Sequence, residues 1–402
     1  LWFCKSRFNK FSYVDQVGRT FTKNIKMKFF FIIKIIIIKI IRLNISFLKR
    51  EISGYPNFVK KFENDFASFI GKKYGISFCN GTSSIEAAIF SLNFSKDDEI
   101  LITSSNFHAS IGPIKNLNCK PVFVDIDSKT LTVDCDDLKK KINHKSKCLL
   151  IVHPWGYPCN MSEIMKIIKE NNLKLIEDCS HSHGALYENQ KVGSFADISC
   201  FSLQGGKAIK AGEGGIALTD NEDYYYRMSV YGHFNRHEKY LENIEQLKYF
   251  SKTGLSKKLR AHPLGISIAS ADLDNLVNLN KFKNKIYNKI DKIISKYDSI
   301  STMQLNKQAI RGGFFGGYPI IFENINQIAE IKKKFNKYNI DIYPYQWLNH
   351  HKMKVFGTDE IGLPVTESIL NKFYLINIPY FLNFNFKKLE DCLMECKKSN
   401  LI

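Results

Sequence analysis

The stretch FSLQGGKAIKAGEGG (residues 201–215) decides the fold, because it places Lys207 among glycines directly after an apolar run. A phosphate-binding P-loop needs a glycine where Phe201 stands and a Ser or Thr where Ala208 stands. A dinucleotide-binding fingerprint needs its third glycine at Ala217. Both motifs are excluded. Two interpretations remain for Lys207: a solvated loop lysine, or a lysine whose amine forms a Schiff base with a carbonyl compound.

The overall composition allows a large globular enzyme. A chain of 402 residues with 44% hydrophobic residues has room for one large α/β domain and a smaller companion. The net charge of +19 raises the question of nucleic-acid binding. However, the lysines are spread through nearly every segment, and the sequence has no helix-turn-helix, zinc-finger or RNP pattern. We expect no nucleic-acid partner, and an anionic small substrate or an acidic membrane surface fits the charge equally well.

The ten cysteines have irregular spacings and form no C-x-x-C pair. Several lie inside apolar runs, such as Cys148 in KCLLIV and Cys200 in ISCFSL. This usage predicts buried free thiols in a reducing cytoplasm rather than a disulfide framework or a zinc site. No set of ligands completes a metal site, so we expect no metal.

The N-terminal segment differs from the rest of the chain. From Met27 it reads MKFFFIIKIIIIKIIRLNISFLKR, whose apolar runs are too short to cross a membrane. It also lacks the unbroken apolar centre and cleavage site of a signal peptide. At helical spacing one side collects the basic residues Lys28, Lys34, Lys39, Arg42 and Lys49.

Two hypotheses fit this pattern: a helix that lies in a membrane interface, and an ordinary amphipathic helix packed on its own protein. Residues 1–26 precede the first methionine and show no clear periodicity. We expect them to be disordered or foreign to the natural chain.

Beyond about residue 70, short β-rich runs alternate with helical stretches, which is typical of a mostly parallel sheet with helices on its faces. A helix is predicted over 160–172, where Asn160 is a suitable N-cap and Glu163 follows three positions later. The expected strands are 99–103, 120–126, 148–153, 173–178, 198–203 and 214–219.

After about residue 274 the pattern changes to a long lysine-rich helix followed by the Gly-rich turn and strand GGFFGGYPIIF (312–322). A helix-strand pair over 328–345 and a terminal helix over 385–399 complete a smaller α+β unit. We therefore divide the chain into an N-terminal extension (1–49), a large domain (50–274) and a small domain (275–402).

Polar groups at the carboxyl ends of the strands are the candidate functional residues. Asp178 ends one strand, where its carboxylate either holds a pyridine nitrogen protonated or caps a turn. Gly81, Thr82 and Ser83 begin an apolar helix, whose N-terminus suits a phosphate. Phe107 follows another strand, where it offers a flat face to a ring or belongs to the core.

Taken in order, these segments resemble the DegT/DnrJ/EryC1/StrS family of PLP-dependent sugar aminotransferases over roughly residues 50 to 395. The segments are NGTSSIEAAIFSL, DEILITSSNFHAS, KPVFVDID, IEDCSHSHGA, the stretch around Lys207, and LRAHPLG. The resemblance implies the aspartate aminotransferase-like fold type I, with a mostly parallel seven-stranded sheet flanked by helices in a large PLP-binding domain. The smaller α+β domain then follows at the C-terminus.

The resemblance also implies roles for single residues. Lys207 would bind PLP covalently and shuttle a proton between substrate and cofactor. Asp178 would be the partner of the pyridinium nitrogen, and His181 stands where many members carry the Gln that supports the ring hydroxyl. Phe107 would stack on the ring.

The phosphate would be held by Gly81, Thr82 and Ser83, joined by Ser202 ahead of the lysine. In this fold the site lies at a homodimer interface, and the partner chain commonly lends an Asn to the phosphate. Lys258 stands at the matching position, where it could serve only as a point charge.

The resemblance implies a transaminase that moves an amino group from glutamate to a keto-sugar, on a nucleotide carrier, for polysaccharide or secondary-metabolite synthesis. The alternatives are a PLP-dependent sugar dehydratase of the same family and a catalytically silent, membrane-associated homologue. Members that dehydrate have histidine in place of the lysine, so Lys207 favours transamination. We expect a cytoplasmic protein, peripheral at the inner face of the membrane if residues 28–49 bind lipid.

The segment YGHFNRHEKYLENIEQLKY (231–249) is polar, aromatic and irregular, so we expect it to shape the substrate pocket. Within it, His233, Arg236 and His237 are expected to be surface residues or substrate contacts rather than metal ligands.

Overall fold

The computed structural model describes residues 23–49, 51–234, 236–242, 244–345, 349–356, 362–378 and 384–402. The expectation that residues 1–26 are disordered or foreign to the natural chain falls largely outside this range, because residues 1–22 are not described. The side chain of Lys28 is not described either. Within this range the expected strands and helices can be compared directly with the structure.

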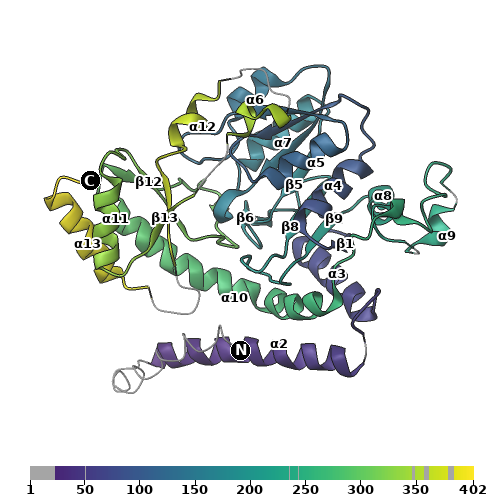
Figure 1. Ribbon diagram of the computed structural model, residues 1–402, viewed down its shortest axis with the longest axis horizontal. Helices are drawn as coiled ribbons and strands as arrows, with labels where there is room; N and C mark the ends of the chain where they lie inside the picture. Colours follow the sequence, from purple (N-terminus) through teal and green to yellow (C-terminus); the bar gives the residue numbers. More distant parts are fainter. Residues whose placement is uncertain are drawn as a thin grey trace.

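A seven-stranded sheet forms the centre of the molecule, with strand order β1-β9-β8-β5-β4-β2-β3 (Figure 1). Four of its strand pairs are parallel, and β9 runs antiparallel to both of its neighbours. The mostly parallel sheet expected from the sequence is therefore confirmed. Its strands are β1 (Tyr74–Phe78), β2 (Glu99–Thr103), β3 (Lys120–Val124), β4 (Ser146–Val152), β5 (Lys174–Asp178), β8 (Ile198–Ser202) and β9 (Gly215–Thr219).

Helices cover both faces of this sheet, because alternate residues of each strand point to opposite sides. In β2, Ile100 and Ile102 join the buried cluster of the α4 side, whereas Leu101 joins the cluster of the α7 side. One face carries α4 (Gly81–Ser91), α5 (His108–Asn116) and α8 (Glu222–Val230). The other face carries α3 (Asn57–Ile70), α6 (Cys135–Lys141), α7 (Met161–Glu170) and the start of α10 (Pro263–Ile294).

The expected helix at 160–172 is α7, and its start confirms the predicted cap. The side chain of Asn160 accepts the N–H of Glu163. Buried isoleucines at helical spacing, Ile164, Ile167 and Ile168, hold the helix on the sheet.

The C-terminal part is built on a second sheet of four strands, with order β10-β12-β14-β13. Figure 1 shows it at the far end of α10 from the large sheet. Its strands are β10 (Ile300–Ser301), β12 (Tyr318–Phe322), β13 (Ile342–Pro344) and β14 (Phe373–Ile376), with α11 (Ile328–Lys337) and α13 (Phe386–Lys398) beside them. The start of α12 (Pro364–Ile369) instead bonds to Asp125, just after β3. The expected boundary at residue 274 lies inside α10, which continues from one part to the other.

Short elements complete the part of the chain that the structure describes. A three-stranded sheet, order β11-β6-β7, is made by β6 (Leu186–Tyr187), β7 (Gln190–Lys191) and β11 (Ala309–Ile310). The remaining turns of helix are η2 (Pro154–Gly156), α9 (Glu238–Leu241), η3 (Gly254–Ser256), η4 (His350–Lys352) and η5 (Lys354–Phe356).

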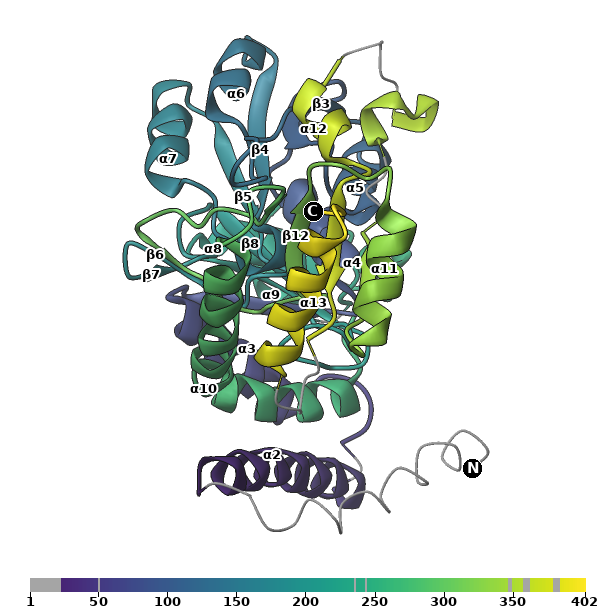
Figure 2. The same cartoon turned by 90° about the vertical axis from the view of Figure 1, so that its left-hand side faces the viewer.

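The N-terminal helix α2 (Lys23–Leu48) lies along the outside of α10, at the edge of the molecule in both views (Figures 1 and 2). In the part of the chain that the structure describes, we find no helix that is both long and apolar enough to span a membrane.

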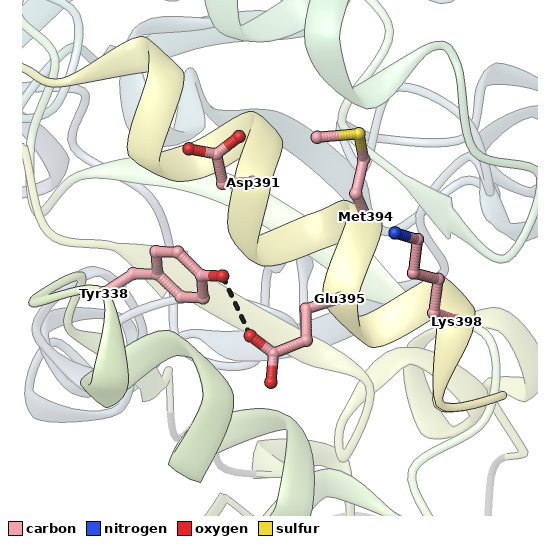
Figure 3. A pocket seen from close by; sticks show the side chains of 5 residues that line it. All are labelled: Tyr338, Asp391, Met394, Glu395 and Lys398. Atoms are coloured by element: carbon pink, nitrogen blue, oxygen red, sulfur yellow. Dashed lines mark hydrogen bonds between the residues drawn. The ribbon is translucent and has the colours of Figure 1, made fainter.

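A shallow depression on the C-terminal part is lined by residues of α13 and by Tyr338, which follows α11 (Figure 3). One of its two carboxylates, Glu395, already accepts hydrogen bonds from Lys334, Lys337 and Tyr338. These bonds tie α11 to α13, so we assign the depression a structural role.

Candidate active site

Lys207 lies on a tight loop that begins where β8 ends at Ser202. The loop closes on itself because the N–H of Gly205 donates to the carbonyl of Gly212 at 2.8 Å. The N–H of Lys207 donates to the carbonyl of Gln204, also at 2.8 Å. The backbone is therefore held firmly, and the lysine projects from the end of the central sheet.

The Lys207 side chain is buried, with 9% of its surface exposed. Its Nζ lies 3.6 Å from the ring centroid of Phe315, which belongs to the Gly-rich turn before β12. Burial lowers the pKa of the amine from 10.5 to about 8, although the charge of Asp178 acts in the opposite direction. The solvated-loop interpretation of Lys207 is therefore wrong: its amine is desolvated and partly neutral near neutral pH.

Asp178 ends β5 and is also buried. Its Oδ2 accepts the hydroxyl of Ser110 at 2.6 Å, and its Oδ1 accepts the N–H of Ser180 at 3.0 Å. Hydrogen bonds donated to both oxygens stabilise the charged carboxylate and fix its orientation. Ser110 comes from the first turn of α5, which follows β2, so the contact joins the ends of β5 and β2, two strands that β4 separates in the sheet.

His181 is positioned three residues after Asp178 and stacks on Phe315, with ring centroids 4.2 Å apart. Its Nδ1 accepts the N–H of Trp155 at 3.4 Å, which leaves the proton of a neutral ring on Nε2. Burial, together with the charge of nearby Lys207, lowers the pKa of His181 well below 6.5. The ring is thus a neutral hydrogen-bond donor beside the amine.

Gly81 and Ser202 are brought together at the start of α4. A Cβ at Gly81 would lie 2.9 Å from the Cβ of Ser202, so only glycine fits this approach. The side chain of Asn80 caps the helix by accepting the N–H of Ser83 at 2.8 Å, and the Ser83 hydroxyl faces Cys79. Thr82 is the half-buried second residue of the helix. A helix N-terminus thus lies against the strand that leads to Lys207.

Phe107 and Lys258 are both exposed. Phe107, 54% exposed, precedes α5, and its carbonyl accepts the N–H of Ser110 at 3.0 Å. Lys258 is followed by Leu259, whose carbonyl accepts the N–H of Cys79. Phe107 is therefore linked to Asp178 through Ser110, and Lys258 lies on the segment beside the phosphate-binding turn predicted at Gly81.

Ser110 and Phe315 did not figure among the candidate residues. Ser110 is the third residue of α5, and a serine there usually signals only a helix start. Phe315 stands in GGFFGG, whose glycines indicate a turn, more than 100 residues along the chain from Lys207. Only the packing of the turn against residues 181–185 and against the loop of Lys207 reveals its contact with the lysine.

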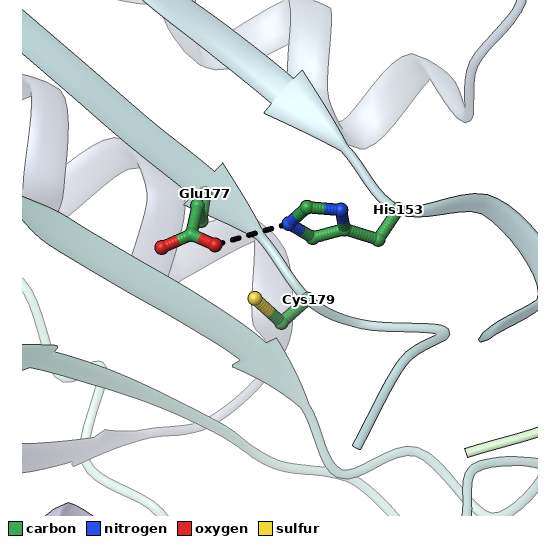
Figure 4. Close-up of side chains that lie close together, drawn as sticks. All are labelled: His153, Glu177 and Cys179. Carbon is green, nitrogen blue, oxygen red and sulfur yellow. Dashed lines mark hydrogen bonds and ion pairs between the residues drawn. The ribbon is translucent and has the colours of Figure 1, made fainter. Parts of the chain in front are cut away.

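Behind the site, His153, Glu177 and Cys179 lie close together and have the residue types of a metal centre (Figure 4). Glu177 accepts His153 Nε2 at 3.1 Å, and His153 Nδ1 accepts the N–H of Cys159 at 3.0 Å. The same carboxylate accepts three backbone N–H groups, those of residues 193, 195 and 196. Burial raises the pKa of the Cys179 thiol to about 12, which keeps it protonated. These contacts make the cluster a structural network.

The expectation that His233 and Arg236 are surface residues or substrate contacts is wrong. Arg236 is 7% exposed and pairs with buried Glu63 of α3 at 2.7 Å. His233 is 2% exposed and packs edge-on against Phe78. Of the three, only His237 is partly exposed, and its ring packs at tilted and edge-on angles against Tyr225 and Tyr226. Arg236 is neutralised by Glu63, which lies 173 residues away in the sequence. The sequence of residues 231–249 alone could not reveal this partner.

Comparison with known proteins places the site in context. GDP-perosamine synthase from Escherichia coli O157:H7 is 38% identical over 176 residues, which are 44% of this chain and 48% of that protein. A dTDP-3-amino-3,6-dideoxy-alpha-D-galactopyranose transaminase from Aneurinibacillus thermoaerophilus is 34% identical over 218 residues, 54% of this chain and 59% of that protein. The matches thus span about half the length of these relatives.

A solved structure of an aminotransferase from Psychrobacter cryohalolentis superposes with a TM-score of 0.81 and covers 95% of this chain and 98% of that chain. At 20% identity this likeness shows the fold, which is the one expected from the resemblance. The family model of the DegT/DnrJ/EryC1/StrS aminotransferases matches residues 47–392, nearly the whole described chain. The protein therefore belongs to the DegT/DnrJ/EryC1/StrS aminotransferase family.

Proposed function

We propose that this protein is a PLP-dependent aminotransferase that moves an amino group from glutamate to a nucleotide-linked keto-sugar. One observation carries the proposal: Lys207 and Asp178 are both buried, and the charge of the Asp178 carboxylate acts on the Lys207 amine. Burial lowers the pKa of that amine to about 8. An amine of this kind is a ready nucleophile for an aldehyde and a ready proton carrier.

The residues present fit PLP group by group. The Lys207 amine suits the aldehyde, and the Asp178 carboxylate suits the protonated ring nitrogen. The neutral His181 ring can donate to the ring hydroxyl. The start of α4, packed against Ser202, suits the phosphate because helix N–H groups favour anions. We assign Gly81, Thr82 and Ser83 to the phosphate, and Phe107 to the open face of the ring.

When bound, PLP supplies the electron sink that allows a bond at the amino carbon to break. The protein supplies the rest. Lys207 Nζ accepts a proton from the amino donor and later gives it back at a different atom. An amine that loses its proton near pH 8 is suited to both steps. Asp178, held by Ser110 and Ser180, keeps a proton on the ring nitrogen by its negative charge. Phe315 covers the amine and limits its access to water.

The nucleotide-linked sugar is supported by the names of the two relatives, which refer to GDP- and dTDP-sugars. The net charge of +19 suits a diphosphate-bearing substrate. We further propose that the protein is a homodimer in the cytoplasm and that each active site is shared between the two copies. The partner's Lys258 would then lie near the phosphate.

The cofactor part is tested by spectroscopy and trapping. The purified protein should be yellow and should bleach when glutamate is added. Borohydride reduction followed by peptide mapping should place the cofactor on Lys207, and Lys207→Ala should remove both the label and the colour. A label at another lysine, or a colourless protein that ignores added PLP, would refute the assignment.

The substrate part is tested by products. Incubation with glutamate and a panel of nucleotide keto-sugars, read by mass spectrometry, should reveal an amino sugar and an equal amount of 2-oxoglutarate. Loss of a hydroxyl group from the sugar without net amino transfer would instead identify a dehydratase.

A further inference from the structure

The N-terminal helix α2 docks on the protein through a mixed side, on which Lys39, Arg42 and Ser46 lie beside the half-buried Ile35, Ile38 and Leu43. Lys39 Nζ pairs with Asp272 of α10 at 2.7 Å, and Arg42 pairs with Asp274 at the same distance. Arg42 also donates to the hydroxyl of Ser270 at 2.6 Å. A surface helix of a globular protein normally buries most of its apolar side chains, whereas α2 is held by ion pairs and leaves most of its isoleucines exposed.

The apolar side of α2 consequently faces outward. Residues at helical spacing on that side, Ile37, Ile41, Ile45 and Leu48, are 44–83% exposed. Further apolar side chains extend the same surface, which we call the α2 apolar face: Ile36, Ile37, Ile40, Ile41, Ile45, Phe47 and Leu48. A contiguous surface of this kind indicates a binding partner.

The charges around the α2 apolar face indicate the chemistry of that partner. Residues 23–48 contain no Asp or Glu. Lys34 and Lys49 are exposed. By helical spacing Lys34 continues the line of Ile37, Ile41 and Ile45 at its N-terminal end, away from Lys39 and Arg42, and Lys49 lies at the edge of that line near its C-terminal end. An apolar stripe flanked only by cations complements a surface that is apolar inside and anionic outside.

Pairing of α2 with a second copy of itself fits these charges less well. In an antiparallel pair Lys34 of one helix would approach Lys49 of the other, and in a parallel pair each would approach its own equivalent. Neither arrangement supplies an acidic partner, so the like charges would repel.

We propose that the α2 apolar face lies in the headgroup region of an anionic lipid bilayer and holds the enzyme at the membrane surface. The isoleucines enter the boundary between headgroups and acyl chains, and Lys34 and Lys49 contact anionic headgroups. Lys39 and Arg42, on the opposite side, keep α2 attached to α10. The helix thus lies parallel to the bilayer, and the catalytic part remains in water.

The proposal is tested by flotation of the full chain with phosphatidylcholine vesicles, prepared with and without phosphatidylglycerol. The protein should float with the anionic vesicles, and added salt should weaken this binding. The double substitution Ile37→Glu with Ile41→Glu should reduce the vesicle-bound fraction at least about tenfold, because it places two carboxylates in the buried face.

The matched control is Ile310→Glu, since Ile310 and Ile37 are each 49% exposed and Ile310 lies on β11, far along the chain from α2. This variant should float like the parent protein. Thermal unfolding and sedimentation of each variant establish that fold and association state are unchanged. The proposal is overturned if the parent floats with neither vesicle, if the double variant floats normally, or if the double substitution dissociates an oligomer without affecting flotation.

Discussion

The lowered pKa of Lys207 has a measurable consequence at the scale of one residue. Only the neutral amine attacks an aldehyde, so the rate at which the protein without cofactor is labelled by PLP and borohydride should rise with pH and level off above about 8. The peptide containing Lys207, quantified by mass spectrometry, reports this rate. Exposed lysines in the same digest are the internal control, because their labelling should keep rising toward pH 10. If the labelling of Lys207 rose with pH in the same way as that of the exposed lysines, the lowered pKa of Lys207 would be contradicted.

The lowered pKa of Lys207 also determines how its contribution to the free energy of unfolding changes with pH. Because the folded-state pKa lies below the ordinary 10.5, the unfolded chain binds more protons between about pH 8 and 10.5. The contribution of Lys207 to the free energy of unfolding should therefore increase with pH across that window. The difference between the parent protein and Lys207→Met, measured by urea unfolding at several pH values, should shrink as pH rises. A difference that stays constant with pH would contradict the shift.

Phe315 covers the amine and should control its pKa. Phe315→Ala admits water to Lys207 and should move the labelling inflection upward from about 8, toward the ordinary value of 10.5. Phe315→Leu keeps an apolar cover and should leave the inflection near its original position. If alanine and leucine give the same profile as the parent, the ring is not what desolvates the lysine.

At this scale the sequence located residues that stand at strand ends or helix starts. Lys207, Asp178 and Gly81 could be placed because a strand-loop-helix alternation predicts where their backbones lie. Ser110 and Phe315 could not, since their contacts depend on which turns meet in three dimensions. Arg236 was misplaced for the same reason, because its partner Glu63 lies on a helix near the other end of the domain.

At the scale of elements, Glu177 holds the turn between β7 and β8 to the sheet. Its carboxylate accepts the N–H groups of Gly193, Phe195 and Ala196 in addition to its contact with His153. Glu177→Gln replaces one acceptor oxygen by a donor and should lower the free energy of unfolding by about 3 kcal/mol. Glu170→Gln, at an exposed position of α7, should change it by less than about 0.5 kcal/mol. Equal effects in urea unfolding would show that the network is unimportant.

Buried parallel strands were the elements easiest to predict. The runs that became β2 and β4 have uninterrupted centres of Ile, Leu, Val and Cys, as expected for strands covered on both faces. By contrast, β1 (YGISF) contains Gly75 and Ser77, and it was not foreseen. A Cβ at Gly75 would lie 2.7 Å from the carbonyl oxygen of Glu63, so close packing against α3 explains the glycine.

At the scale of the whole molecule, the buried pair of Glu63 and Arg236 joins α3 to the segment that follows α8. Tyr55 contacts both charges, so the chain just before α3 is held as well. Arg236→Met leaves a carboxylate buried without its cation and should lower the free energy of unfolding by roughly 3–5 kcal/mol. Lys61→Met removes an exposed ion pair of the same helix, where the lysine is 73% exposed, and should have little effect. Similar losses in the two variants would contradict this role.

The division of the molecule was harder to predict than its elements. A change in composition near residue 274 suggested a boundary, but α10 crosses it without interruption. The reason is that its first half packs on the large sheet through Ile266, Ala269 and Leu276, and its second half on the small sheet through Ile286 and Ile290. Each half has a normal amphipathic pattern, so sequence alone cannot show that they belong to one continuous helix.

The 32 residues of α10 form one unbroken helix, which bends between its two halves and joins the large sheet to the small sheet (Figure 2). Near its start, Gly265 packs so closely on the carbonyl of Ala211 that a Cβ there would lie 2.5 Å from that oxygen, and this contact adjoins the loop of Lys207. Any side chain at position 265 would therefore push the start of α10 away from that loop, and continuous backbone hydrogen bonds would pass the displacement on to the small sheet.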